Sequence, residues 1–285
     1  MASMIDIKRR KNSIENTEQI TKAMKLVSTV KFQRARQRAE ESKPYFQKMY
    51  QTMESILGTT EGIDHPYLKR NEVSKKGIIT ISSNRGLAGG YNNNIARLIR
   101  DTGWSRDQTL IYGIGHKAME ILAHQGYQIV SDDSDMINEP EYEDARKLGD
   151  RVLRDYENGR IGEIYLAYTE FKSTVVHQPR LIRLLPIEPG HKKEEGAGGK
   201  LLMNFEPQPE ELLSMLIPKY VCSMIYGALA ASAASENGAR MQAMDSASSN
   251  AEEMISELEL AYNRARQGAI TQELTEIISG AEALK

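Results

Sequence analysis

Residues 244–265 read MDSASSNAEEMISELELAYNRA, and this stretch decides the fold. Its apolar and small residues recur at alternating steps of three and four, which is the heptad period of a helix that winds around a partner helix. The repeating positions are Met244, Ala247, Ala251, Met254, Leu258, Ala261 and Ala265. After Gly268 the phase restarts with Ile270, Leu274, Ile277 and Ala281. The sequence therefore predicts a long C-terminal helix with a narrow apolar face.

The positions of the prolines indicate how far the terminal helices extend. All 9 prolines lie between Pro44 and Pro218, and proline is costly inside a helix. Near the start, Ile7, Ile14, Ile20, Met24 and Val27 recur at helical spacing. We therefore expect helices over residues 1–58 and 208–285 that pair as a long antiparallel coiled coil, with Val27 near residues 264–277. The alternative is a helical bundle with a bent C-terminal helix.

Charge is divided unevenly along the chain. The total is close to neutral, with 37 Lys and Arg against 39 Asp and Glu. Residues 1–60 hold 12 basic and 6 acidic side chains, whereas residues 201–285 hold 5 basic and 12 acidic ones. An antiparallel pair would set the basic helix beside the acidic one. Exposed ion pairs add little stability, so charge would select the pairing. A near-neutral total predicts no nucleic-acid partner.

Two features bear on cellular location. Cys222 is the single cysteine, so no intramolecular disulfide can form and a reducing cytosol is expected. Residues 220–235 are uncharged, but these 16 residues fall short of the roughly 20 that a membrane-spanning helix needs. We therefore expect no membrane-spanning segment here.

The central residues, 75–206, show a different pattern. Short strands are expected at residues 76–81, 109–112, 127–130 and 163–168, with helices at 92–101, 116–125 and 142–156 between them. Strands that alternate with helices predict an α/β domain of the Rossmann type with a largely parallel sheet. An edge hairpin is expected from residues 174–176 and 180–185, and a loop at 191–200.

A dinucleotide-binding fingerprint supplies the main alternative function. Gly113, Gly115 and Ala118 match the spacing G-x-G-x-x-A between a predicted strand and a predicted helix. Asp132 and Asp133 lie where an acid that binds the ribose is expected. These residues would suit an NAD-binding oxidoreductase with a coiled-coil arm. Against this reading, the match follows the second strand, and strand-to-helix turns need glycine for steric reasons alone.

A second glycine-rich stretch reads SSNRGLAGG over residues 82–90. It lacks the Gly-Lys-Ser/Thr ending with which a phosphate-binding loop holds nucleotide and magnesium. The five histidines are scattered, and no nucleophile is paired with a base and an orienting group. These observations predict no bound cofactor, no metal site and no catalysis. A chain made for binding fits them better, and a coiled-coil arm on an RNA-binding enzyme is a third possibility.

Three motifs carry a resemblance that covers essentially the whole chain. Residues 7–14 read IKRRKNSI and residues 19–28 read QITKAMKLVS, while residues 83–89 read SNRGLAG. The C-terminal motif comprises Ile270, Thr271, Glu273, Glu276, Gly280 and Ala281, preceded by Arg240, Met241, Ala243, Met244, Asn250 and Ala251. With these motifs the chain resembles the gamma subunit of F-type ATP synthase, in its bacterial form.

The resemblance implies a rotor shaft. The paired terminal helices would stand inside a ring of alternating alpha and beta subunits, and the α/β domain would lie with the epsilon subunit on the c-subunit ring. One copy would couple proton flow to ATP synthesis or hydrolysis on the beta subunits. The chain itself would be non-catalytic, peripheral, and located at the cytoplasmic face of the cell membrane.

The resemblance also implies which residues meet the ring. Lys31, Arg34 and Arg85 would face acidic segments of beta. Arg266 and Gln267 would approach a loop of one beta subunit, with Thr271 and Glu273 one turn nearer the tip. Residues 227–239 and 246–250 are small or polar, which suits an axle that turns without interlocking with its bearing.

Overall fold

The computed structural model describes residues 4–59, 65–69, 72–173, 176–187 and 209–283. The chain divides into two compact units. One unit comprises residues 29–239, and the other combines residues 1–28 with residues 240–285. Helices α1 (Met4–Thr59) and α5 (Pro209–Ala283) each contribute to both units. Both helices continue through a proline, at Pro44 and at Pro218.

The unit of residues 29–239 is built on a five-stranded sheet in the order β3-β2-β1-β4-β5. The strands are β1 (Lys76–Ile81), β2 (Thr109–Ile114), β3 (Gln128–Asp132), β4 (Glu163–Phe171) and β5 (His177–Leu185). The first four run parallel, and β5 is antiparallel to β4. The connecting helices are α2 (Tyr91–Arg100), α3 (His116–His124) and α4 (Tyr142–Glu157), with short 3-10 turns η1 (Arg106–Gln108) and η2 (Ser134–Ile137). The predicted fold class is confirmed.

The strand boundaries differ from the prediction in the hairpin. Strand β4 continues to Phe171, three residues beyond its predicted end. Its antiparallel partner begins at His177 rather than at Arg180. Most of the strand expected at residues 174–176, and the loop expected at 191–200, lie outside the described residues.

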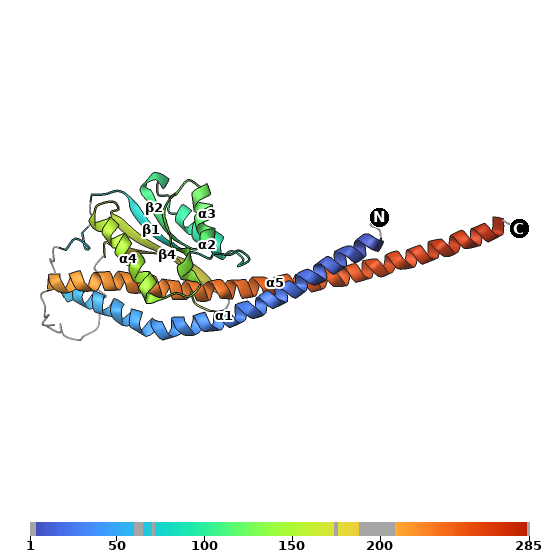
Figure 1. Cartoon of the computed structure of the whole chain (residues 1–285), viewed down its shortest axis with the longest axis horizontal. Coiled ribbons are helices and arrows are strands. Elements are labelled where there is room, and N and C mark those ends of the chain that lie inside the picture. The colour runs from blue at the N-terminus through green and yellow to red at the C-terminus, as the bar shows by residue number, and fades with distance from the viewer. Residues whose placement is uncertain (1–3, 60–64, 70–71, 174–175, 188–208, 284–285) are drawn as a thin grey trace. The chain divides into compact units, whose positions relative to one another are not determined.

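Helices cover both faces of the sheet (Figure 1). Helices α2 and α3 bury Ile95, Ile99 and Leu122 against one face. On the other face, α4 and residues of α5 contribute Leu148, Val152, Leu213, Ile217, Val221, Ile225 and Leu229. Alternate residues of β1 enter the two cores, with Ile78 in the first and Ile79 in the second. This alternation is what a parallel sheet covered on both faces requires.

The uncharged residues 220–235 form part of the second core. Helix α5 is the one described helix that is long and apolar enough to cross a membrane, and half of its most apolar window is buried within the protein. Cys222 lies against Gly149 of α4, where an added Cβ would approach its Sγ to 2.7 Å. Burial raises the pKa of the Cys222 thiol to about 11, so the thiol is unreactive at neutral pH. This apolar stretch is thus accounted for as a core helix.

The small residues at 227–239 serve close packing, so their expected role as a bearing surface is wrong for most of this stretch. An added Cβ at Gly227 would lie 3.0 Å from the ring of Phe46, and one at Gly238 would lie 2.9 Å from His177. Ser232 Oγ accepts the backbone N–H of Thr169 at 3.3 Å. The small side chains allow α5 to lie directly against its own domain.

In the other unit, α1 and α5 run antiparallel. Ion pairs between described residues join them: Lys11 to Glu259 at 2.6 Å, Lys22 to Glu252 at 2.8 Å and Lys25 to Asp245 at 2.6 Å. Glu259 on α5 raises the pKa of Lys11 above the ordinary lysine value. Glu18 on α1, together with Glu252 on α5, raises the pKa of Lys22. The predicted pairing of a basic with an acidic helix is confirmed. The expected pairing of Val27 with residues 264–277 is wrong, because Lys25 already lies beside Asp245.

The seam between the two helices also differs from the predicted one. On α5 it follows Met244, Ser248, Ala251, Ile255, Leu258, Tyr262 and Ala265. Every second position agrees with the prediction, while the others lie one residue later. Met254 is 40% exposed, and Ala261 is exposed as well. On α1, Thr21 and Ser28 are buried in place of Ile20 and Val27.

A buried histidine joins the residues that follow α1 to the start of α5. The backbone N–H of Tyr67 donates to His65 Nδ1 at 3.2 Å, so this nitrogen carries no proton. His65 Nε2 lies 2.9 Å from Ser214 Oγ, and Ser214 donates to the Glu210 carbonyl at 3.0 Å. Burial lowers the pKa of His65 despite an opposing attraction from Glu210. The fold therefore requires the neutral imidazole.

This histidine predicts a pH dependence of stability. Because its folded pKa is lowered, the unfolded chain binds more protons near pH 6.5 than the folded chain, and stability is lost as pH falls through that value. The slope from one proton is at most about 1.4 kcal/mol per pH unit. In urea unfolding of the full chain between pH 7.5 and about pH 5, His65→Gln should remove part of this slope. His124→Gln, at an exposed position on α3, should keep the wild-type slope, and equal slopes for both variants would refute the assignment.

Candidate functional site

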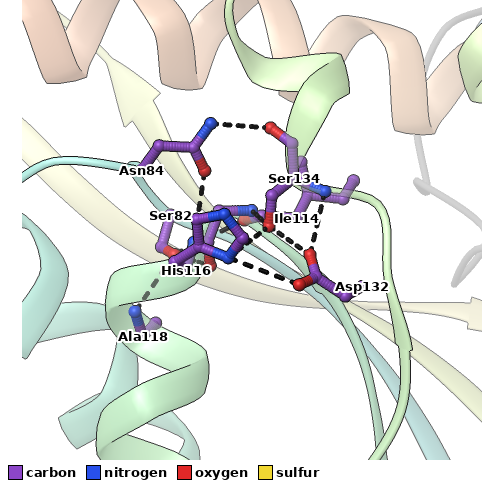
Figure 2. A network of polar contacts seen from close by, with 8 residues as sticks. Ser82, Asn84, Ile114, His116, Ala118, Asp132 and Ser134 are labelled. Atoms are coloured by element: carbon purple, nitrogen blue, oxygen red, sulfur yellow. Dashed lines mark hydrogen bonds and ion pairs between the residues drawn. The ribbon is translucent and has the colours of Figure 1, made fainter.

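Three segments with candidate chemistry meet at one edge of the sheet (Figure 2). They are the glycine-rich loop after β1, the fingerprint turn between β2 and α3, and the turn η2 that follows β3. The carboxyl ends of parallel strands lie at a common edge, which is where open α/β folds place their ligands. The fold thus puts the fingerprint in the position that nucleotide binding would require.

The backbone amides of the fingerprint turn are all engaged within the chain. Gly115 N–H donates to Ser134 Oγ at 3.2 Å, and His116 N–H donates to Asn84 Oδ1 at 3.3 Å. Lys117 N–H donates to the Ser83 carbonyl at 3.0 Å, and Ala118 N–H to Ser82 Oγ at 3.1 Å. These are the groups that would bind a pyrophosphate at a helix N-terminus. The chain's own oxygen atoms occupy the place of the anion.

The two fingerprint glycines are required by packing. An added Cβ at Gly113 would lie 1.8 Å from Met119 Sδ. Gly115 has φ +91°, and its added Cβ would lie 2.2 Å from the Ser82 carbonyl oxygen. Only glycine fits this backbone conformation at such a distance. The steric interpretation of the fingerprint is therefore the correct one.

The two acids expected to bind a ribose are also engaged. Asp132 Oδ1 accepts the Ser134 N–H at 3.1 Å, and Asp132 Oδ2 lies 3.3 Å from His116 Nδ1. Asp133 accepts a hydrogen bond from Arg151 at 2.8 Å and has a side chain only 10% exposed. Asp133 is covered by Arg151, while Asp132 is exposed but already bonded to Ser134 and His116. The NAD-binding alternative is not supported.

Sequence reasoning missed Ser134 and Asn84, which complete the network. Besides capping His116, Asn84 donates from Nδ2 to the Ser134 carbonyl at 2.8 Å, 50 residues along the chain. Ser134 follows the two acids as the first residue of η2, and serine is common in turns. That position hints at a local turn, but nothing in the sequence indicates the distant amide that it caps.

The network also fixes the glycine-rich loop. The Ser83 N–H donates to Asn92 Oδ1 at 3.0 Å, and Ser83 Oγ lies 2.6 Å from the Arg85 carbonyl. Leu87 has φ +62° and is 63% exposed. Arg85 is exposed as well. The loop exposes a cation, Arg85, and an apolar side chain, Leu87, and the hydrogen bonds of Ser83 fix its backbone. Such a loop is suited to contact a partner protein.

The other predicted contact residues are all exposed. Lys31 and Arg34 lie one turn apart on α1, in the unit of residues 29–239 that also holds Arg85. Arg266, Gln267, Thr271 and Glu273 lie within about two turns of α5 in the other unit. There Thr271 Oγ1 donates to the Gln267 carbonyl at 2.9 Å. Among the described residues no cluster of three or more His, Cys, Asp or Glu could hold a metal ion.

Comparison with known proteins gives one consistent family. A family model described as ATP synthase matches residues 3–284. The ATP synthase gamma chain of Lachnoclostridium phytofermentans is 55% identical over 290 residues, covering 100% of both chains. The ATP synthase gamma chain of Acetobacterium woodii, named as sodium ion specific, is 38% identical over 98% of both chains. A chain in the Euglena gracilis mitochondrial ATP synthase structure of OSCP, F1 and c-ring shares the fold, with a TM-score of 0.74 at 18% identity, covering 99% of this chain and 94% of that chain.

The filled turn predicts the outcome of two glycine substitutions. Gly115→Ala should destabilise the full chain by about 3 kcal/mol, because it adds backbone strain and a clash with Ser82. Gly86→Ala is the matched control, since an added Cβ there meets nothing within 4 Å, and should change stability by less than about 0.5 kcal/mol. Urea unfolding measures both. Saturable binding of NAD to the wild-type chain at micromolar concentration, followed by fluorescence, would contradict the filled site.

Proposed function

The chain belongs to the ATP synthase gamma chain family and is a central stalk subunit, and from this premise we propose that it turns inside a ring of alpha and beta subunits. In this role it couples ion flow through a membrane-embedded ring of c subunits to ATP synthesis or hydrolysis on beta. One copy serves each complex, and the epsilon subunit binds beside the α/β domain. The assembly lies at the cytoplasmic face of the cell membrane, with this chain as a peripheral subunit.

The observation that carries the proposal is the match to gamma chains along the full length, together with the antiparallel pair of terminal helices. The helix pair leaves its outer side chains open to other proteins. On α5 every described residue from Thr271 to Glu282 is exposed. A helix that carries Ile270, Leu274 and Ile277 on such a surface is suited to lie within a partner assembly.

The hydrogen-bonded turn at the carboxyl edge of the sheet supports a non-catalytic role. The turn at which an α/β domain would bind a nucleotide is filled by Ser82, Asn84 and Ser134. The chain would therefore act through contacts with its partners and would need no cofactor of its own. Its α/β domain is proposed as a structural body that anchors the shaft, with no role in binding nucleic acid.

Copurification tests the proposed partners. A tagged chain expressed with its host's proteins should elute in a complex with two larger ATP-binding chains, present in several copies, and one copy of itself. The complex should include a small subunit that stays with this chain when alpha and beta are removed. Recovery of the chain alone from intact membranes under mild detergent would overturn the assignment of partners.

The coupling ion that we propose is the proton. The related chain from Acetobacterium woodii is named as sodium ion specific, so gamma chains accompany more than one coupling ion. Membrane vesicles distinguish the two cases. If ATP acidifies the vesicle interior without a need for sodium, the proton is supported. If ATP turnover depends on sodium, the proton is contradicted.

The exposed residues near Gly268 predict a loss of turnover without a loss of assembly. We expect Arg266→Ala with Gln267→Ala to lower steady ATP turnover of the reconstituted complex severalfold, since a charge-assisted bond from arginine to a partner carboxylate contributes about 1.5–3 kcal/mol when partly desolvated. Glu253→Ala is the control, because Glu253 is exposed on the same helix in the same unit. Equal turnover in both variants, at equal subunit stoichiometry, removes Arg266 and Gln267 from the functional contacts.

A further inference from the structure

The helix pair in the unit of residues 1–28 and 240–285 buries hydroxyl groups in its seam. Thr21, Ser28 and Ser248 are 8%, 3% and 5% exposed. Ser248 Oγ lies 2.8 Å from Thr21 Oγ1 and 2.9 Å from the Met244 carbonyl, while Thr21 donates to the Glu18 carbonyl at 2.9 Å. This first seam, marked by Thr21, Ser28 and Ser248, contains a hydrogen bond between the two helices, from Ser248 to Thr21.

Apolar side chains lie one residue earlier and remain exposed. Ile20 precedes Thr21 and is 60% exposed, and Val27 precedes Ser28 and is 58% exposed. On α5, Met254 precedes the half-buried Ile255 and is 40% exposed. Ala247 precedes Ser248 and is half-buried. These four residues, Ile20, Val27, Ala247 and Met254, define a second seam that follows the heptad period of the sequence.

We propose that the two helices can exchange the first seam for the second by turning about their own axes. The positions Met244, Ala251 and Leu258 belong to both seams, so they can stay at the interface during the exchange. Adjacent residues are about 100° apart around a helix, and only every second position changes, so α5 turns by about 50°. This inference concerns the helix pair itself and does not depend on the proposed function.

The antiparallel arrangement makes the exchange mechanically simple. Each helix brings the preceding residue into the interface, which is the same sense of turning about its own N-to-C axis. Because the two axes point in opposite directions, the helices turn oppositely in space, as two meshed gears do. Small residues such as Ala251 at the shared positions reduce interlocking, which otherwise opposes turning in a close-packed interface.

Each packing is stabilised by a different interaction. The first seam keeps the Thr21–Ser248 hydrogen bond but leaves Ile20, Val27 and Met254 in water. The second seam buries these apolar side chains and returns the hydroxyl groups to water, where they remain hydrogen-bonded. The ion pairs between the helices involve long, exposed lysine side chains that can reach their carboxylates in both packings. Neither packing is therefore favoured overwhelmingly.

Disulfide trapping in the full chain tests the exchange, with Cys222→Ala as the background. Thr21→Cys with Ser248→Cys reports the first seam, because the native oxygen atoms are 2.8 Å apart. Ile20→Cys with Ala247→Cys reports the second seam. Ala23→Cys with Ser249→Cys is the control, since both residues are exposed and outside either seam. The rate of disulfide formation under a mild oxidant is measured for each pair.

The first pair should react fastest, and the second pair at roughly 1–10% of its rate, as expected for a minor state of that population. The control pair should react at less than about a tenth of the rate of the second pair, since it meets in neither packing. No reaction of the second pair, or a control rate equal to it, overturns the proposal. The latter result would mean that the helices merely separate.

A further substitution tests whether the Thr21–Ser248 hydrogen bond favours the first seam. Adding Ser248→Ala to the Ile20→Cys and Ala247→Cys chain removes the hydrogen bond of the first seam. It should raise the rate of disulfide formation about fivefold, the change in equilibrium that an ordinary net hydrogen bond produces. Ser249→Ala, the matched control outside both seams, should leave the rate unchanged. An equal response to both substitutions contradicts the two-seam model even if every variant folds.

Discussion

The burial of residues 213–235 of α5 against the sheet is the interaction on which the α/β domain depends. This segment supplies one wall of the larger core, with Leu213, Ile217, Val221, Ile225 and Leu229 on one helical face. A helix can lie this close only because small residues face each other, as Gly149 faces Cys222. Without α5, the apolar side chains that it covers on this face of the sheet would be open to water. The domain and the start of the C-terminal helix therefore fold as one body.

Small residues have different tasks along the same helix. Within the α/β unit, Gly227, Ser232 and Gly238 permit close approach and hydrogen bonding to the domain. In the other unit, Ser248 and Ala251 are buried in the seam with α1, between larger residues such as Met244 and Leu258. The same few residue types thus serve close packing in one unit and a buried side-chain hydrogen bond in the other. Packing context, more than composition, decides which property results.

Much of the fold could be predicted from periodicity, because strands and helices impose repeats of about 2 and 3.6 residues on the sequence. The offset in the coiled-coil seam could not, since Ala247 and Ser248 are both small and hydropathy favours the apolar choice. The partner-contact residues Arg266 and Gln267 were located through resemblance, and their exposure fits that role without testing it. The cap on the fingerprint turn joins Ser82, Asn84 and Ser134 across distant segments, which no local pattern can reveal.

The self-capped turn has a consequence for a subunit that works beside nucleotide sites. Cellular ATP is abundant around such an assembly, and any α/β domain with open amides at its strand ends would compete for it. Here the serine, asparagine and backbone oxygens of the chain neutralise those donors permanently. The turn therefore offers a nucleotide none of the four amides of residues 115–118. A domain closed in this way would keep the same structure whatever the ATP concentration around it, as the proposed role of a structural body requires.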